Sequence, residues 1–393
     1  MKAGVRGRRA TVSGDWKRAV VACVLLGAPA VHASSVVQPR LRLMAEERFD
    51  DDLQVGPAAT GGQMMTKFSP QLGVNVKDER SEVDAFYAGD VLARHGSGKV
   101  SLDHRVGLEG QHWLSRRFKV DGAARVFRVT DPTSLPRAGL AWLDAPTFYA
   151  QARLGLMARL SQRMDLHGAY AFETTRVLEP GRLGGSSHSP NLELWYHATR
   201  RLSLGAQYRY QGFLYAGRDS QSHGAFAMLR YRLSRPMTLT LQGGPVDYVA
   251  PAGQQGGWLP RVQLELARHG ERFDVGATVG HDLVGATGFV GAVWADYASM
   301  VVNHRFSAPL SAFVMGSYFR NGRAPDQFYG EWKNTVHVAQ GYAVGAGVEY
   351  RLRHGLSMQG AFNRIEQVGV ANAVEAGDLT RNVLAARLVY TAW

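Results

Sequence analysis

Hydrophobic and polar residues alternate with a period of two along most of the chain. In one segment, Leu202, Leu204, Ala206, Tyr208 and Tyr210 alternate with Ser203, Gly205, Gln207, Arg209 and Gln211. The same alternation runs through 100–111, 148–156 and 342–351. A segment of about ten residues with this period matches a tilted strand that crosses a lipid bilayer. The pattern therefore predicts a protein built from membrane-spanning strands.

Short polar connections and longer connections separate these segments in turn. Eight short connections have similar sequences, with 231–239 the clearest and 78–81 and 268–271 the weaker members, and nine longer ones lie between them. The longer ones fall near 50–62, 95–98, 131–145, 179–189, 217–222, 251–256, 284–287, 321–333 and 369–379. This repeat of hairpins predicts about 18 strands, and a barrel of 16 strands is the alternative.

The two faces of the predicted strands differ in chemistry. One face mixes Ala and Gly with Leu, Val and aromatic residues, and the other is rich in Arg, Gln, Glu, Asp and Ser. A closed ring of this many strands cannot fill its centre with side chains, so a polar inside and an apolar outside suit water and lipid. We therefore expect an all-β fold, a single closed antiparallel transmembrane β-barrel with short periplasmic turns and longer outer loops. A soluble all-β sandwich or propeller is the alternative.

Several aromatic residues fall near the strand ends that meet the longer connections. They are Tyr170, Phe172, Tyr208, Tyr210 and Tyr318. Aromatic rings at such positions suit the boundary between lipid and water. We expect them to form part of an interfacial girdle on the outer face.

The first 33 residues have the features of a secretory signal peptide. Basic residues precede the apolar stretch 19–28, and Val31-His32-Ala33 puts small residues at the −3 and −1 positions before Ser34. The one Cys of the chain lies in this segment, and the net charge of +12 falls to about +7 without it. We expect residues 1–33 to be removed and residues 34–393 to form the barrel, with no nucleic acid among its partners.

The C-terminus resembles in part the strand that ends many outer-membrane barrels, with Trp at the last position where Phe is usual. The segment 384–393 alternates and finishes at Trp393, with Tyr390 as a second aromatic residue three positions earlier. We expect Tyr390 and Trp393 to be the signal that the barrel-assembly machinery recognises, although three positions put them on opposite faces of an ideal strand. We also expect lipid of the outer membrane to surround the barrel as a partner.

Two short motifs near the start of the predicted barrel carry a family resemblance. Phe49-Asp50-Asp51-Asp52 is followed by Phe68-Ser69-Pro70-Gln71. These motifs resemble those of the outer-membrane β-barrel porins found with exopolysaccharide secretion systems of Gram-negative bacteria, with Asp52 in place of an Asn. The resemblance implies an outer-membrane channel for a secreted polysaccharide, which would be its cargo, and a periplasmic polysaccharide-export protein as a partner. A general diffusion porin or a transporter of small or hydrophobic solutes is the alternative, and an outer-membrane enzyme or adhesin is a further one.

The alternation also assigns residues to the water-filled side of the wall. The predicted lumen-lining residues are Asp103, Arg105, Glu109, Arg125, Arg153, Glu173, Glu193, Trp195, Arg209, Arg230, Arg261, Glu349 and Arg351. Acidic and basic residues balance on this face, which predicts weak ion selectivity and a cargo with little charge. Trp113, Phe127, Tyr149 and Trp195 share the face, and their rings offer surfaces along which sugar rings could slide.

Nothing in the sequence indicates catalysis. The 13 His residues are scattered, without the spacing of a zinc site or a Ser–His pair, and the glycines at 181–185 precede no predicted helix. We expect no enzymatic activity, no metal and no cofactor.

Overall fold

The computed structural model describes residues 36–51, 62–130, 146–178, 184–215, 218–250, 256–285, 292–323, 339–368 and 379–392. The predicted signal peptide and Trp393 lie outside these ranges. In the described residues, no helix is long and apolar enough to span a membrane. The strands are β1 (Val36–Asp50), β2 (Gln63–Lys77), β3 (Ser81–Arg94), β4 (Val100–Trp113), β5 (Phe118–Val129), β6 (Thr147–Arg159), β7 (Met164–Val177), β8 (Gly185–His197), β9 (Leu202–Tyr215), β10 (Arg218–Ser234), β11 (Met237–Val249), β12 (Gly257–Arg268), β13 (Phe273–Gly285), β14 (Ala292–Arg305), β15 (Leu310–Arg323), β16 (Ala339–Arg351), β17 (Leu356–Val368) and β18 (Leu379–Ala392).

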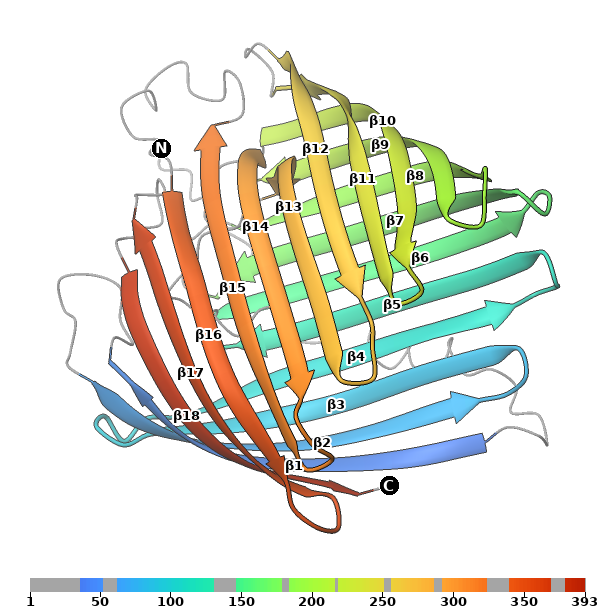
Figure 1. Ribbon diagram of the computed structural model, residues 1–393. Helices are drawn as coiled ribbons and strands as arrows, with labels where there is room; N and C mark the ends of the chain where they lie inside the picture. The colour runs from blue at the N-terminus through green and yellow to red at the C-terminus, as the bar shows by residue number, and fades with distance from the viewer. Residues whose placement is uncertain are drawn as a thin grey trace, which may run out of the picture.

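These strands form one closed antiparallel barrel (Figure 1). Each strand pairs with the next along the chain, and β18 pairs with β1 to complete the ring of 18. The prediction of an 18-stranded closed barrel is confirmed. Closure gives every strand two neighbours, so the backbone hydrogen bonds of the sheet have no open edge.

A hydrogen bond from backbone N–H groups to a Ser or Thr side chain recurs in the short connections. The hydroxyl of Ser115 accepts hydrogen bonds from the backbone N–H groups of Arg117 and Phe118, at 3.1 and 3.2 Å. Thr199 holds Arg201 and Leu202 in the same way, at 3.1 and 2.9 Å. A Ser or Thr oxygen thus replaces a backbone acceptor and tightens the turn, which explains why similar text recurs in the sequence. We call this edge of the barrel the short-turn end and the opposite edge the long-loop end.

Two strands begin earlier than the sequence predicts. Strand β8 starts at Gly185 and β10 at Arg218, so 185–189 and 218–222, expected in connections, belong to the sheet. These segments are rich in Ser and His and lack hydrophobic alternation, but each pairs with the strand before it, for example Ser187 with Glu173 and Asp219 with Leu214. Polar residues suit this edge because it lies above the apolar band described below.

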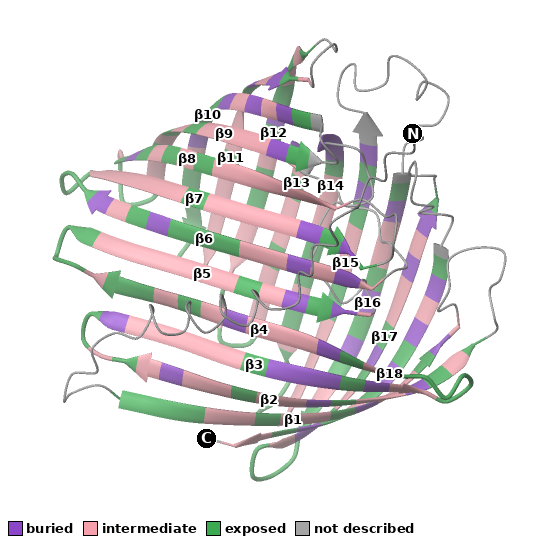
Figure 2. Ribbon diagram, turned by 180° about the vertical axis from the view of Figure 1, so that it is seen from behind, coloured by how far each residue is buried: buried purple, intermediate pink, exposed green. Residues whose placement is uncertain are grey.

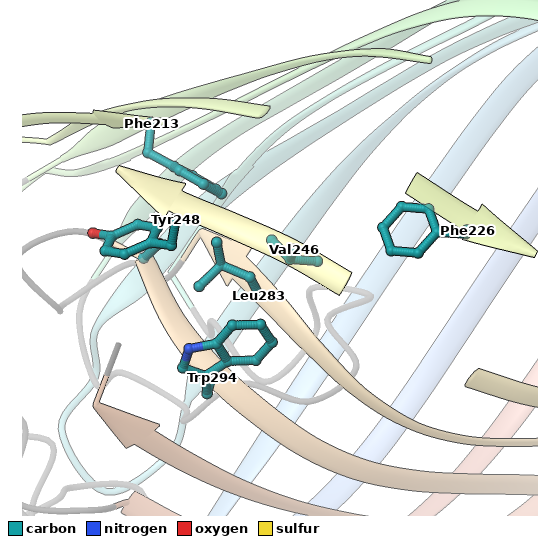
Figure 3. Packing of buried hydrophobic residues seen from close by; sticks show 7 residues of the cluster. Phe213, Phe226, Val246, Tyr248, Leu283 and Trp294 are labelled. Carbon is teal, nitrogen blue, oxygen red and sulfur yellow. The ribbon is translucent and has the colours of Figure 1, made fainter. Parts of the chain in front are cut away.

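Exposed and less exposed positions alternate along the strands (Figure 2). Large hydrophobic side chains remain exposed on one face, among them Leu72, Leu154, Leu192, Leu204 and Val314. Such a surface suits lipid rather than water. A cluster of buried hydrophobic residues lies toward the long-loop end of β9–β14 (Figure 3), and it includes Phe213, Val246, Tyr248, Leu283 and Trp294.

Ionic and amide contacts join the first and last strands. Arg381 of β18 binds the buried carboxylate of Asp50 through Nε and Nη2, at 2.9 and 2.5 Å. Asp51 accepts hydrogen bonds from the backbone and side chain of Asn382, at 2.5 and 2.6 Å. The acidic run after Phe49 therefore helps to close the ring, because paired charge-assisted bonds fix both distance and direction.

Candidate functional site

An ion pair between distant strands identifies the inner face of the barrel. Arg209 Nη2 of β9 lies 2.6 Å from Asp282 Oδ1 of β13. Three strands separate β9 from β13, so the two side chains meet on the concave side of the sheet. Residues that lie on the same face of the sheet as Arg209 and Asp282, followed from strand to strand through the register, therefore point inward. Leu204 alternates with Arg209 on β9 and points outward.

The strand register places all the residues assigned to the lumen on this inner face. They are Asp103, Arg105, Glu109, Arg125, Arg153, Glu173, Glu193, Trp195, Arg209, Arg230, Arg261, Glu349 and Arg351. Their environments differ greatly from one strand to the next. Some are buried among other side chains, and others are open.

Four residues of β9–β13 form what we call the closed corner: Arg209, Phe226, Arg261 and Asp282. Asp282 is buried, and Arg261 Nε lies 2.8 Å from its Oδ2 while Arg209 binds Oδ1. The two guanidinium groups also lie over the ring of Phe226, 4.6 Å (Arg261) and 5.4 Å (Arg209) from its centre. Cα atoms of β8 and β13 also approach one another within 8 Å. The space between β9 and β13 is therefore filled locally, and these charges hold the two strands together across the inner face.

A second buried cluster lies on β2–β4. Asp90 is 2% exposed and binds Lys67 Nζ and Arg105 Nη2, each at 2.9 Å. Asp103 accepts two hydrogen bonds from Thr130, from its backbone N–H and its hydroxyl, both at 2.9 Å. Arg105 and Asp103 thus have structural partners. The sequence does not single out Asp90 as an inward residue, because apolar residues stand at both inward and outward positions around it and the alternation is lost there.

The inner face of β4–β6 carries what we call the open wall: Glu109, Asp121, Arg125 and Arg153. The side chains of Glu109 and Arg153 are 62% and 61% exposed. Arg125 lies 3.7 Å from Glu109, and Arg153 lies 3.8 Å from Asp121. Charges of both signs are therefore presented to the interior with loose pairing.

Three of the four inward aromatic residues named above are buried, and the fourth, Trp113, is half-buried at the end of β4. Trp195 and Tyr149 are only 4% and 3% exposed. Arg230 lies over the indole of Trp195, 4.3 Å from the ring centre, and the indole N–H donates to Glu193 at 3.2 Å. The expectation that Trp195, Phe127 and Tyr149 offer free ring faces to passing sugars is wrong, because the rings pack against the wall and each other.

Glycines opposite the large residues explain this packing. A Cβ atom at Gly205, the cross-strand partner of Trp195, would lie 2.9 Å from the indole. The same pairing joins Phe86 with Gly107, Tyr297 with Gly280, Phe313 with Gly347, Met315 with Gly345 and Phe319 with Gly341. The space that each glycine leaves is therefore occupied by the large side chain of the neighbouring strand.

The inner face of β14–β17 differs from the rest. Among the side chains that the structure describes there, the only charged ones are Arg305, Glu349 and Arg351 at the short-turn end. Val301 and Met315 are exposed there, at 43% and 37%. The predicted residues Glu349 and Arg351 pair with each other at 3.5 Å, near the rim.

The predicted assembly residues are described only in part. Tyr390 lies on the outer face of β18 opposite Leu43 of β1 and is 40% exposed. Trp393 lies outside the described residues. In the described parts of the chain, no group of three or more His, Cys, Asp or Glu residues is arranged to hold a metal ion.

Comparisons with known proteins give architectural relatives. No family model matches the sequence, and no curated protein matches it. The outer membrane protein OpdK from Pseudomonas aeruginosa is similar with a TM-score of 0.47 and 11% identity, covering 91% of this chain and 99% of that chain. OccK5 (OpdH) from the same organism has a TM-score of 0.43 and 12% identity, with coverages of 91% and 98%. OccAB4 from Acinetobacter baumannii has a TM-score of 0.44 and 10% identity, with coverages of 90% and 98%.

Proposed function

We propose that this chain is an outer-membrane β-barrel channel that lets small polar solutes cross the membrane. The open wall carries the proposal, because exposed charges of both signs face the inside of a closed 18-stranded ring. Rings of this size enclose water unless loops fill them, and the lining sets which solutes pass.

The outer face supports a position in a membrane. On β5, outward residues run from Phe118 through Val120, Ala124 and Val126, and the first outward charge is Arg128 near the long-loop end. Ten residues of a strand tilted by about 40° span about 25 Å, which is the height of the apolar band on outer-membrane barrels. Lipid would cover this band.

The alternative of a small-solute channel has better support than polysaccharide export. A sugar polymer would gain from aromatic faces along its path, but Trp195, Tyr149 and Phe127 are buried. The open wall instead offers separate charged and hydrogen-bonding groups, which suit individual polar solutes. Signal cleavage after Ala33 and recognition of Tyr390 and Trp393 by the assembly machinery remain parts of this proposal.

Reconstitution of the refolded barrel tests the channel directly. We expect discrete conductance steps in planar bilayers, and liposomes that swell in small sugars but not in large oligosaccharides. A barrel that is folded but passes neither ions nor small sugars would refute the proposal. A gene-deletion strain that loses a surface polysaccharide while small-solute uptake stays normal would instead favour the exporter.

Orientation has its own test on intact cells. Cysteine at Ser97, in the β3–β4 connection of the long-loop end, should react with a membrane-impermeant maleimide. Cysteine at Arg116, in the β4–β5 turn of the short-turn end, should react only after the outer membrane is permeabilised. Both positions are exposed. The opposite labelling pattern would mean that the short-turn end faces the cell exterior.

A further inference from the structure

Two arginines interrupt the apolar outer face near the long-loop end. Arg128 is the second-last residue of β5, and Arg176 is the second-last residue of β7. Phe148 of β6 is the direct cross-strand partner of both. Both arginine side chains are exposed, and two strand spacings of ~4.8 Å put their backbones about 10 Å apart.

Two Tyr–His pairs flank these arginines on the same face. Tyr87 hydrogen-bonds to His104 Nδ1 at 2.9 Å, and Tyr170 hydrogen-bonds to His188 Nδ1. In each pair the contact with the tyrosine uses Nδ1, which leaves Nε2 as the ring atom that could donate to a phosphate oxygen. His104 is also the cross-strand partner of Arg128. We call Arg128, Arg176, His104 and His188 the outer basic patch.

The charge of this surface has one sign. In the described residues of β4–β8, no outward position holds Asp or Glu. The other side of the barrel differs, since Asp219, Asp247 and Asp296 lie outward on β10, β11 and β14. Arg320 on β15 also faces outward there, but its direct cross-strand partner is Asp296.

We propose that the outer basic patch binds the phosphate groups of a phosphorylated glycolipid in the outer leaflet. The guanidinium groups bind phosphate oxygens by charge-assisted hydrogen bonds, and the acyl chains lie on the apolar rows below. Phe148 lies between the two arginines in the strand register, where an aromatic ring suits the boundary between head groups and acyl chains. This inference goes beyond the proposed channel and rests only on its location in the outer membrane, since none of these side chains faces the lumen.

Native mass spectrometry of the detergent-solubilised full-length mature barrel tests the site, with bis-phosphorylated lipid A as the probe. We expect the R128Q/R176Q variant to bind the probe at least about tenfold more weakly than the unaltered barrel. The matched control R320Q removes an outward arginine beside an acidic residue and should stay within about twofold. Lipid A stripped of phosphate should bind the unaltered barrel as weakly as the probe binds the double variant.

Three outcomes would overturn the proposal. In the first, the double variant binds the probe as tightly as the unaltered barrel does. In the second, the unaltered barrel binds the phosphate-free glycolipid as tightly as the probe. In the third, the substitutions abolish association between two barrels and leave the amount of bound lipid unchanged, so that the patch is a contact between copies of the chain. Heat-modifiable migration on gels confirms that each variant is folded. The double variant should keep its conductance, so failure of the lipid site and failure of the channel are separable.

Discussion

The closed corner and the open wall use the same residue types on the same face of the barrel. In the closed corner, Arg261 and Asp282 are 5% and 6% exposed and their charges lie 2.8 Å apart. On the open wall, the side chain of Arg153 is 61% exposed and lies 3.8 Å from Asp121. An inward arginine is therefore part of a buried ion pair in one region and a solvent-exposed group in the other.

Barrel curvature produces this difference. Strands β8 and β13 approach each other, so inward side chains of the closed corner meet those of the opposite wall and lose their water. The ion pairs of the open wall instead stay solvated, because the side chains of Glu109 and Arg153 are largely exposed. Exposed pairs contribute about 0–1 kcal/mol, whereas removing one partner of a buried pair costs about 3–5 kcal/mol.

Asp282→Asn should have the largest effect. It leaves Arg209 and Arg261 buried close together without a countercharge, which should lower the free energy of unfolding by about 3–5 kcal/mol. Guanidinium-induced unfolding of the detergent-solubilised barrel measures the change. The matched control Asp121→Asn on the open wall should cost less than about 1 kcal/mol. Equal losses would show that the closed corner is as solvated as the open wall.

Gly205→Leu should have an intermediate effect. A side chain there meets Trp195 and displaces it from the Arg230 guanidinium, with an expected loss of about 1–3 kcal/mol. Gly276→Leu is the control, because no atom lies within 4 Å of a Cβ built at this inward glycine of β13. The same unfolding experiment compares the two. A larger loss at Gly276 would contradict the packing of Trp195 against the wall.

The sequence predicts the faces and the number of strands, because alternation and turn chemistry are local. It does not predict which inward charges are buried, since Arg209 and Asp282 are 73 residues apart and meet only through curvature. The burial of Trp195 likewise depends on its register with Gly205. The role of the acidic residues after Phe49 in ring closure is likewise not predictable from the sequence motif. It depends on the pairing of Asp50 with Arg381, which lies at the other end of the chain.

Neutralising the open wall should have the smallest effect in energy and the clearest effect on transport. Removing one charge about 5 Å from a passing ion changes its energy by about 0.8 kcal/mol in water, a factor of about four before salt screening. Arg125→Gln with Arg153→Gln should therefore lower the anion-to-cation permeability ratio by roughly two- to fourfold, and Glu109→Gln should raise it. Reversal potentials across planar bilayers under a salt gradient measure both. Since these side chains are exposed, the unfolding free energy should change by less than about 1 kcal/mol. If the ratio stays constant while stability falls, the open wall is a structural element like the closed corner, and solutes take another path.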